Sequence, residues 1–171
     1  ILVASSGVSS LKELKKRFIV DKISKKKRNK KEINKKKLEH LYEYEIFKKN
    51  IKLIKSLALR FREINFIVRK HPNENIRDWE KIIKKFPENV YFDNRFDIYG
   101  WLYLSKCIIH TASTVGLQAY FMKKNVISFV PRIPGSHRGF SNRFGTKATN
   151  IIQVEKKIDK ILNNKNIVGM F

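Results

Sequence analysis

Acidic residues are scarce in this chain of 171 residues, which has 15 Asp and Glu against 38 Lys and Arg and a formal net charge of +23. A single cysteine excludes an intrachain disulfide scaffold. No apolar run reaches the length of about 18 residues that a transmembrane helix needs. With 42% hydrophobic residues and 12% aromatics, the chain can nevertheless build a core, and its length suits one domain of ordinary size.

Cofactor and metal motifs are also missing. Neither a Gly-x-Gly-x-x-Gly pattern nor a phosphate-binding Walker motif occurs. The four His and one Cys lack the spacing of a zinc site, so we expect neither a metal nor a cofactor. Cys107 lies within an apolar run and is interpreted as a core residue, and an unpaired cysteine fits a cytosolic setting.

The positive charge is concentrated in one stretch. Residues 12–37 hold 14 Lys and Arg and three acids, a local charge of +11, whereas the rest of the chain carries +12. Lys, Asn and Ile are frequent throughout, as in chains from AT-rich genomes, which favours a solvated basic surface over a nucleic-acid role. Some attraction to phosphates or anionic membranes is still expected. We interpret about 9–37 as a Lys-rich insertion, either a solvated loop or a frayed helix.

Short β-rich runs alternate with helical patterns along the chain. Strands are predicted at 1–4, 64–68, 89–92, 106–110, 125–130 and 149–152. Helices are predicted at 38–63, from Asn73 or Asn75 to 86, at 97–104, from Ser113 or Thr114 to 122, and at 154–162, with a long loop at 131–148. This alternation predicts an α/β domain with a doubly wound parallel sheet of five or six strands over 1–163, followed by a tail at 164–171.

Doubly wound sheets bind ligands outside the carboxyl ends of their strands. That rule selects the loops at 5–10, 71–75, 111–116 and 131–145. In the third loop, Ser113 as helix N-cap would leave the amides of Thr114, Val115 and Gly116 facing a ligand, an arrangement that suits anions. The alternative is an ordinary capped helix whose glycine packs against the sheet.

The second loop places basic residues at a strand end. Arg69 could bind a phosphate bidentately, and His71 could donate a hydrogen bond to it. The alternative is a strand end with solvated basic side chains. We expect Asp93 and Asp97, four residues apart, to cap helices and not to form an acid–base pair.

Three segments in a fixed order strengthen the ligand interpretation. They are Arg-Lys-His-Pro-Asn-Glu at 69–74 with Trp79 after it, Asp-Ile-Tyr-Gly-Trp-Leu at 97–102, and Ser-Thr-Val-Gly-Leu-Gln-Ala at 113–119 before a strand that ends in Pro131. This set resembles the nucleotide-binding half of GT-B glycosyltransferases, and more closely the bacterial surface-carbohydrate and capsule polysaccharide biosynthesis family. The resemblance covers about residues 64–152.

The resemblance implies a Rossmann-like domain of the GT-B C-terminal type that holds the nucleotide of an activated sugar, without a metal. The residues that it implies for donor binding are Arg69, His71, Pro72, Asn73, Ser113, Thr114, Gly116 and Gln118. Gln118 stands where an acidic residue would usually reach the ribose. The acceptor domain of such an enzyme, with its catalytic base, is expected to precede Ile1 in a longer protein, so no catalytic residue is assigned here.

The loop at 131–145 is long and basic. Arg132, Arg138 and Arg143 could contact the donor phosphates as the loop folds over them, or the loop could be a solvated surface segment.

The resemblance implies a metal-independent glycosyltransferase that moves a sugar to a growing surface or capsule polysaccharide. Its partners would be a nucleotide-sugar and a saccharide or lipid-linked acceptor, in the cytoplasm or at the inner face of the membrane. Two alternatives stay open. One is a basic module for nucleic acid or anionic membranes centred on 12–37. The other is an isomerase like the sugar-nucleotide 2-epimerases, which would need carboxylates around the sugar, and the loops offer few beyond Glu74 and Asp97.

Overall fold

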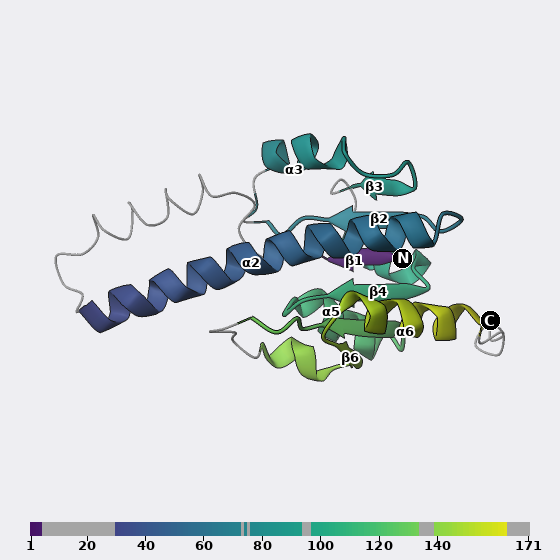
Figure 1. The fold of residues 1–171 in the computed structure, drawn as a ribbon. Helices are drawn as coiled ribbons and strands as arrows, with labels where there is room; N and C mark the ends of the chain where they lie inside the picture. The colour runs from purple at the N-terminus through teal and green to yellow at the C-terminus, as the bar shows by residue number, and fades with distance from the viewer. Residues whose placement is uncertain (5–29, 73, 75, 94–96, 134–138, 164–171) are drawn as a thin grey trace.

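The computed structural model describes residues 1–4, 30–72, 74, 76–93, 97–133 and 139–163 (Figure 1). In chain order its elements are β1 (Leu2–Ala4), α2 (Lys30–Arg60), β2 (Phe66–Arg69), α3 (Ile76–Ile83), β3 (Val90–Phe92), α4 (Ile98–Leu104), β4 (Cys107–His110), α5 (Thr114–Phe121), β5 (Asn125–Phe129), the 3-10 helix η2 (Phe140–Arg143), β6 (Thr146–Ala148) and α6 (Ile151–Asn163). The six strands form one parallel sheet flanked by helices, which confirms the predicted Rossmann-like α/β fold.

The strand order is β3-β2-β1-β4-β5-β6, so the chain winds outward from β1 in both directions. β1 therefore lies between β2 and β4, at the point where the direction of winding reverses. In open α/β sheets this reversal opens a crevice at the carboxyl ends of the central strands. The strand order therefore predicts a ligand site at the carboxyl ends of β2, β1 and β4.

The alternation of side chains along each strand divides the core between the two faces of the sheet. On one face, α2, α3 and α6 cover a large cluster that includes Leu53, Leu57, Trp79, Val154 and Ile158. On the other face, α4 and α5 cover a smaller cluster. It consists of Leu2, Leu102, Ile108, Ala119 and Val126. Both helical layers are needed because the central strands are buried on both faces.

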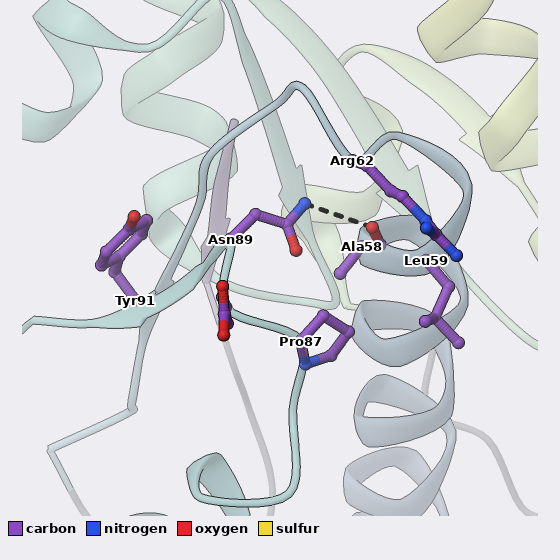
Figure 2. A pocket seen from close by; sticks show the side chains of 7 residues that line it. Ala58, Leu59, Arg62, Pro87, Asn89 and Tyr91 are labelled. Carbon is purple, nitrogen blue, oxygen red and sulfur yellow. Dashed lines mark hydrogen bonds between the residues drawn. The ribbon is translucent and has the colours of Figure 1, made fainter.

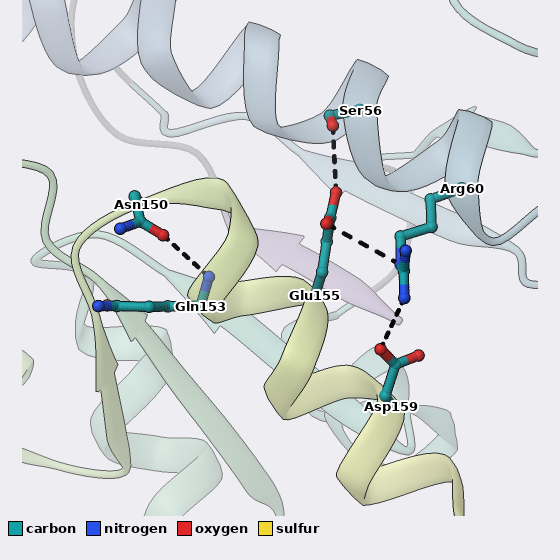
Figure 3. A network of polar contacts seen from close by, with 6 residues as sticks. All are labelled: Ser56, Arg60, Asn150, Gln153, Glu155 and Asp159. Carbon is teal, nitrogen blue, oxygen red and sulfur yellow. Dashed lines mark hydrogen bonds and ion pairs between the residues drawn. The ribbon is translucent and has the colours of Figure 1, made fainter.

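Helix α6 returns across the sheet to lie against α2 (Figure 1). Figure 3 shows the polar contacts between the two helices. The guanidinium of Arg60 lies 2.8 Å from an Asp159 carboxylate oxygen, and the Ser56 hydroxyl donates to Glu155 over 3.3 Å. Because Arg60 is half exposed, these contacts orient α6 more than they stabilise it.

Helix α2 is longer than the sequence pattern predicts. It begins at Lys30, not Leu38, so the last part of the predicted Lys-rich insertion is helical, and it ends at Arg60 instead of Glu63. Figure 1 shows its first turns projecting past the carboxyl ends of the strands. Lysine is a good helix former, and a helix outside the core needs no apolar periodicity. Among the described helices, none combines the length and apolarity required to cross a bilayer.

The last strand is displaced from its predicted position. It spans Thr146–Ala148, inside the predicted loop, and not 149–152. Residues 149 and 150 instead precede and cap α6: the Asn150 side chain accepts from the Gln153 amide (2.9 Å), and the Gln153 side chain accepts from the Thr149 amide (2.8 Å). This reciprocal capping extends α6 back to Ile151.

Cys107 is fully buried in β4, as expected of a core residue, and burial raises its thiol pKa to about 12. Since the thiolate is the reactive form, we expect native protein at pH 8 to react with a thiol reagent roughly a thousandfold more slowly than unfolded protein. Time courses with and without guanidinium would measure this ratio. Rapid labelling of the native chain would contradict the burial of β4.

Candidate functional site

Four residues form a row across the carboxyl end of the sheet. Ala4 of β1 is in register with Arg69 of β2 on one side and His110 of β4 on the other, and His110 is in register with Ser128 of β5. These positions alternate with residues of the large cluster, so the row lies on the α4–α5 face. Neighbouring strands are about 4.8 Å apart, so the backbones at Arg69 and His110 are about 10 Å apart.

Helix α5 begins directly above this row. Ser113 is its N-cap, as predicted, and the Ser113 side-chain oxygen accepts a hydrogen bond from the Val115 amide at 3.3 Å. The Gly116 amide donates to the Ser113 carbonyl at 3.1 Å. The expectation of three outward-facing amides is therefore wrong for Val115 and Gly116, which are used within the first turn. The positive end of the helix dipole still faces the strand ends.

The turn between β4 and α5 has an unusual backbone. Ala112 adopts a positive φ of 51°, a region that costs a residue with a side chain roughly 1 kcal/mol. Its amide donates to the Asn142 side-chain oxygen at 2.7 Å, and Asn142 comes from η2. The segment after β5 thus fixes the conformation of the turn that leads into α5.

His110 supports the start of α5 from below. Its Nε2 lies 2.8 Å from the Ser128 hydroxyl, and that hydroxyl donates to the Phe144 carbonyl at 2.7 Å. Because the Ser128 proton is directed to Phe144, we assign the histidine proton to Nε2. The Nδ1 atom is buried and has no hydrogen-bond partner among the described residues. Desolvation lowers the pKa of His110 from 6.5 to about 4, so the ring is neutral near pH 7.

Gly116 allows α5 to approach this ring. A Cβ at position 116 would lie 2.2 to 2.4 Å from three ring atoms of His110. The glycine is therefore required for close packing between helix and sheet, which was the plainer of the two sequence interpretations of this residue. The sequence did not indicate His110 itself, although a histidine ending an apolar strand immediately before a capped turn was the available signal.

The His71 turn lies at the same edge of the sheet, after β2. The Glu74 carboxylate accepts from the His71 amide at 2.8 Å and from the Trp79 indole at 3.1 Å. The Glu74 amide in turn donates to the His71 carbonyl at 2.9 Å. Trp79 is buried between Phe47 and Phe92, so this turn is anchored in the core. Glu74 is thus a positioning residue that fixes the backbone beneath the exposed His71 ring.

Gln118 connects α5 to α4. Its side-chain amide donates to the Tyr99 hydroxyl over 3.4 Å, on the face of the sheet where Arg69 and His110 lie. Asp97 occupies the N-cap position of α4, but its side chain makes no capping hydrogen bond, so the expected capping role is wrong. Asp93 is buried directly after β3.

The remaining predicted residues are dispersed. Pro72 is exposed within the His71 turn, and Arg132 is exposed beyond β5. Arg143 lies in η2, with its guanidinium 5.7 Å from the centre of the Phe140 ring. Asn73, Asn75 and Arg138 lie outside the described residues. The described part of the chain contains no group of three or more His, Cys, Asp or Glu placed to bind a metal ion.

A surface hollow of about 420 Å³ lies at the opposite edge of the sheet (Figure 2). Its lining includes Arg62, Glu88 and Tyr91. Within it, the Asn89 side chain donates to the carbonyls of Ala58, Phe61 and Ile64 at 2.9 to 3.2 Å. These bonds satisfy carbonyls at and after the end of α2, so Asn89 has a capping role in this hollow.

We expect Asn89→Ala to lower the free energy of unfolding by about 1 to 2 kcal/mol, because three carbonyls lose their donor. Urea denaturation would measure the change. Glu88→Ala, at an exposed position in the same hollow, is the matched control and should leave stability nearly unchanged. Equal effects for the two variants would mean that the caps contribute little.

Comparison of this chain with family models, curated proteins and solved structures finds no match.

Proposed function

We propose that this chain is the donor-nucleotide-binding domain of a glycosyltransferase, which moves a sugar from a nucleotide-activated donor to a growing surface or capsule polysaccharide. One observation carries the proposal. The His71 turn and the Ser113-capped helix lie at the same edge of the sheet, on either side of β1, where the winding reverses. The acceptor would be a saccharide or a lipid-linked saccharide.

The chemistry at this edge suits a phosphate-bearing leaving group. Departure of a sugar from its nucleotide builds negative charge on the phosphate oxygens. Arg69, the His71 ring and the N-terminus of α5 supply positive charge and hydrogen-bond donors from fixed backbone positions. Such preorganised donors stabilise developing charge without a proton transfer or a metal ion.

The epimerase alternative is less well supported. It would need carboxylates near the sugar, and Glu74 is buried with its carboxylate already accepting from the His71 amide and the Trp79 indole. Asp97 is exposed at the start of α4. The Glu74 carboxylate is therefore not placed to exchange a proton with a ligand at the end of β1, which leaves Asp97 alone where the epimerase chemistry would need several carboxylates.

A nucleotide titration followed by amide NMR tests the proposal, with CMP, UDP, GDP and ADP as probes. Signals of His71 and Ser113–Gly116 should shift with at least one probe. His71→Ala removes an exposed side chain and should weaken that binding roughly tenfold without loss of stability. Arg62→Ala, at the opposite edge, is the matched control and should bind normally.

Ser113→Asp separates capping from ligand binding. Aspartate is as good an N-cap as serine, so thermal stability should be retained. Its negative charge at the start of α5 should nevertheless abolish binding of a phosphate group. Unchanged nucleotide affinity in this variant, or nucleotide shifts confined to the Arg62–Asn89 hollow, would refute the proposed site. If polyanions bind only through residues 12–37 and nucleotides cause no shifts, the nucleic-acid alternative replaces it.

A further inference from the structure

The α4–α5 face of the sheet exposes a cluster of aromatic side chains. Tyr120 and Phe121 end α5, Phe140 begins η2 and Phe144 follows η2. Their ring centroids are 5.3 to 6.2 Å apart, so the four rings form one aromatic patch. Phe121 is 72% exposed and Phe140 63% exposed. Contiguous apolar side chains at such exposure mark an interaction surface.

The charge around the patch has one sign. From residue 98 to residue 154 the sequence contains seven Lys and Arg and no Asp or Glu. These residues supply all of α4, β4, α5, β5, η2 and β6. The Arg143 guanidinium lies over the Phe140 ring, and exposed Lys123 follows Phe121 by two residues. The partner surface must therefore be both anionic and able to take up hydrocarbon.

We propose that the aromatic patch binds the surface of an anionic lipid bilayer. Aromatic rings insert at the boundary between headgroups and acyl chains, and neighbouring Lys and Arg side chains attract anionic headgroups. In this arrangement the exposed rings of Phe121 and Phe140 provide the apolar contact, and the neighbouring Arg143 and Lys123 provide the charge.

Two other occupants fit less well. The rings pack against one another at interplanar angles of 44° to 74°, which does not give the parallel platform that stacks nucleic-acid bases. In a symmetric dimer the patch would pack against the same patch of a second copy. The Lys and Arg side chains around the two patches would then repel one another, because residues 98–154 contain no acid to pair with them. The bilayer alone uses both the apolar side chains and the uncompensated positive charge.

Half of the aromatic patch lies away from the proposed donor site. Tyr120 and Phe121 lie at the C-terminal end of α5, whereas Ser113 caps its N-terminus. A helix of eight residues is about 12 Å long, so these two rings lie about that far from Ser113 along the helix. Phe140 begins η2, whose Asn142 bonds the Ala112 amide next to Ser113, so lipid binding is tested in the absence of nucleotide.

A site-specific label tests the proposal in the full chain. Cys107 is the only cysteine and is buried, so a cysteine introduced by Phe121→Cys can be labelled alone with a polarity-sensitive dye. We expect its emission to shift to the blue with vesicles of phosphatidylcholine containing about a third phosphatidylglycerol, and not with phosphatidylcholine alone. The control, Leu59→Cys at an exposed apolar site on α2, should not shift.

Vesicle partitioning of unlabelled variants completes the test. Phe121→Ser with Phe140→Ser should lower partitioning about tenfold or more. The matched pair Leu59→Ser with Ile152→Ser, which alters exposed apolar residues on the opposite face, should leave it unchanged. Undiminished binding by the patch variant would assign lipid binding to the Lys-rich stretch and overturn the proposal. A dye shift with single-stranded oligonucleotides but not with vesicles would overturn the proposal in favour of nucleic acid. A dye shift that accompanies self-association of the protein, without vesicles, would overturn it in favour of a dimer interface.

Discussion

Gly116→Ala is expected to lower the free energy of unfolding by about 3 kcal/mol. The added methyl would lie 2.2 to 2.4 Å from three atoms of the His110 ring. That ring is buried and bonded to Ser128, so it cannot swing away without breaking a contact or shifting α5. Overpacking of this kind typically costs 1 to 3 kcal/mol. Chemical denaturation would measure the loss, and nucleotide affinity should fall with it.

Two further variants identify the cause. Gly100→Ala places the same methyl in α4, where no heavy atom lies within 4 Å, and should stabilise the protein by up to about 1 kcal/mol. In a His110→Ala background, Gly116→Ala should cost much less than in the wild type, because the cavity accepts the methyl. Additive effects in this double-mutant cycle would show that the ring is not what constrains the helix.

Stability is expected to fall by about 3 kcal/mol as the pH decreases from 6.5 to 4, because of His110. Burial lowers its pKa in the folded state to about 4, while the unfolded chain keeps the ordinary value of 6.5. Between pH 6.5 and pH 4 the His110 ring is therefore protonated in the unfolded state but stays neutral in the folded state. The loss is absent above pH 6.5 and complete below about pH 4.

His110→Gln should flatten this part of the stability–pH profile. Glutamine does not titrate, and its amide can still donate to the Ser128 hydroxyl. His71→Gln is the control, because the His71 side chain is exposed, and it should keep the wild-type slope. Denaturation curves at several pH values would measure the free energy of unfolding of each variant. If His110→Gln leaves the slope against pH unchanged, the pH dependence comes from other groups.

The fold could be predicted from sequence because its signals are local. Short β-branched runs separated by helical periodicity, together with Pro72, Pro87 and Pro131, place most elements within a few residues. The failures have physical causes. Lys30–Lys37 is helical without an apolar stripe, since it lies beyond the core. The strand Thr146–Ala148 has two exposed residues of three and thus no hydrophobic pattern to detect.

The candidate site was predictable only in part. The Ser113 cap follows from a rule about adjacent residues, so the sequence reveals it. The register that aligns Arg69, Ala4 and His110 depends on strand pairing across more than sixty residues, which no local pattern encodes. Glu74 stood within a recognised segment, but its burial against Trp79 is a tertiary contact.

The position of β1 has a consequence for folding kinetics. Leu2 pairs with Ile67 on one side and with Ile108 on the other, and all three residues of β1 are buried. During synthesis β1 emerges before both of its partner strands, β2 and β4. The entropy cost of closing two long loops must therefore be met before the contacts of β1 stabilise the fold. We therefore expect slow refolding, with a chaperone-sensitive interval in which an apolar strand edge is open to aggregation.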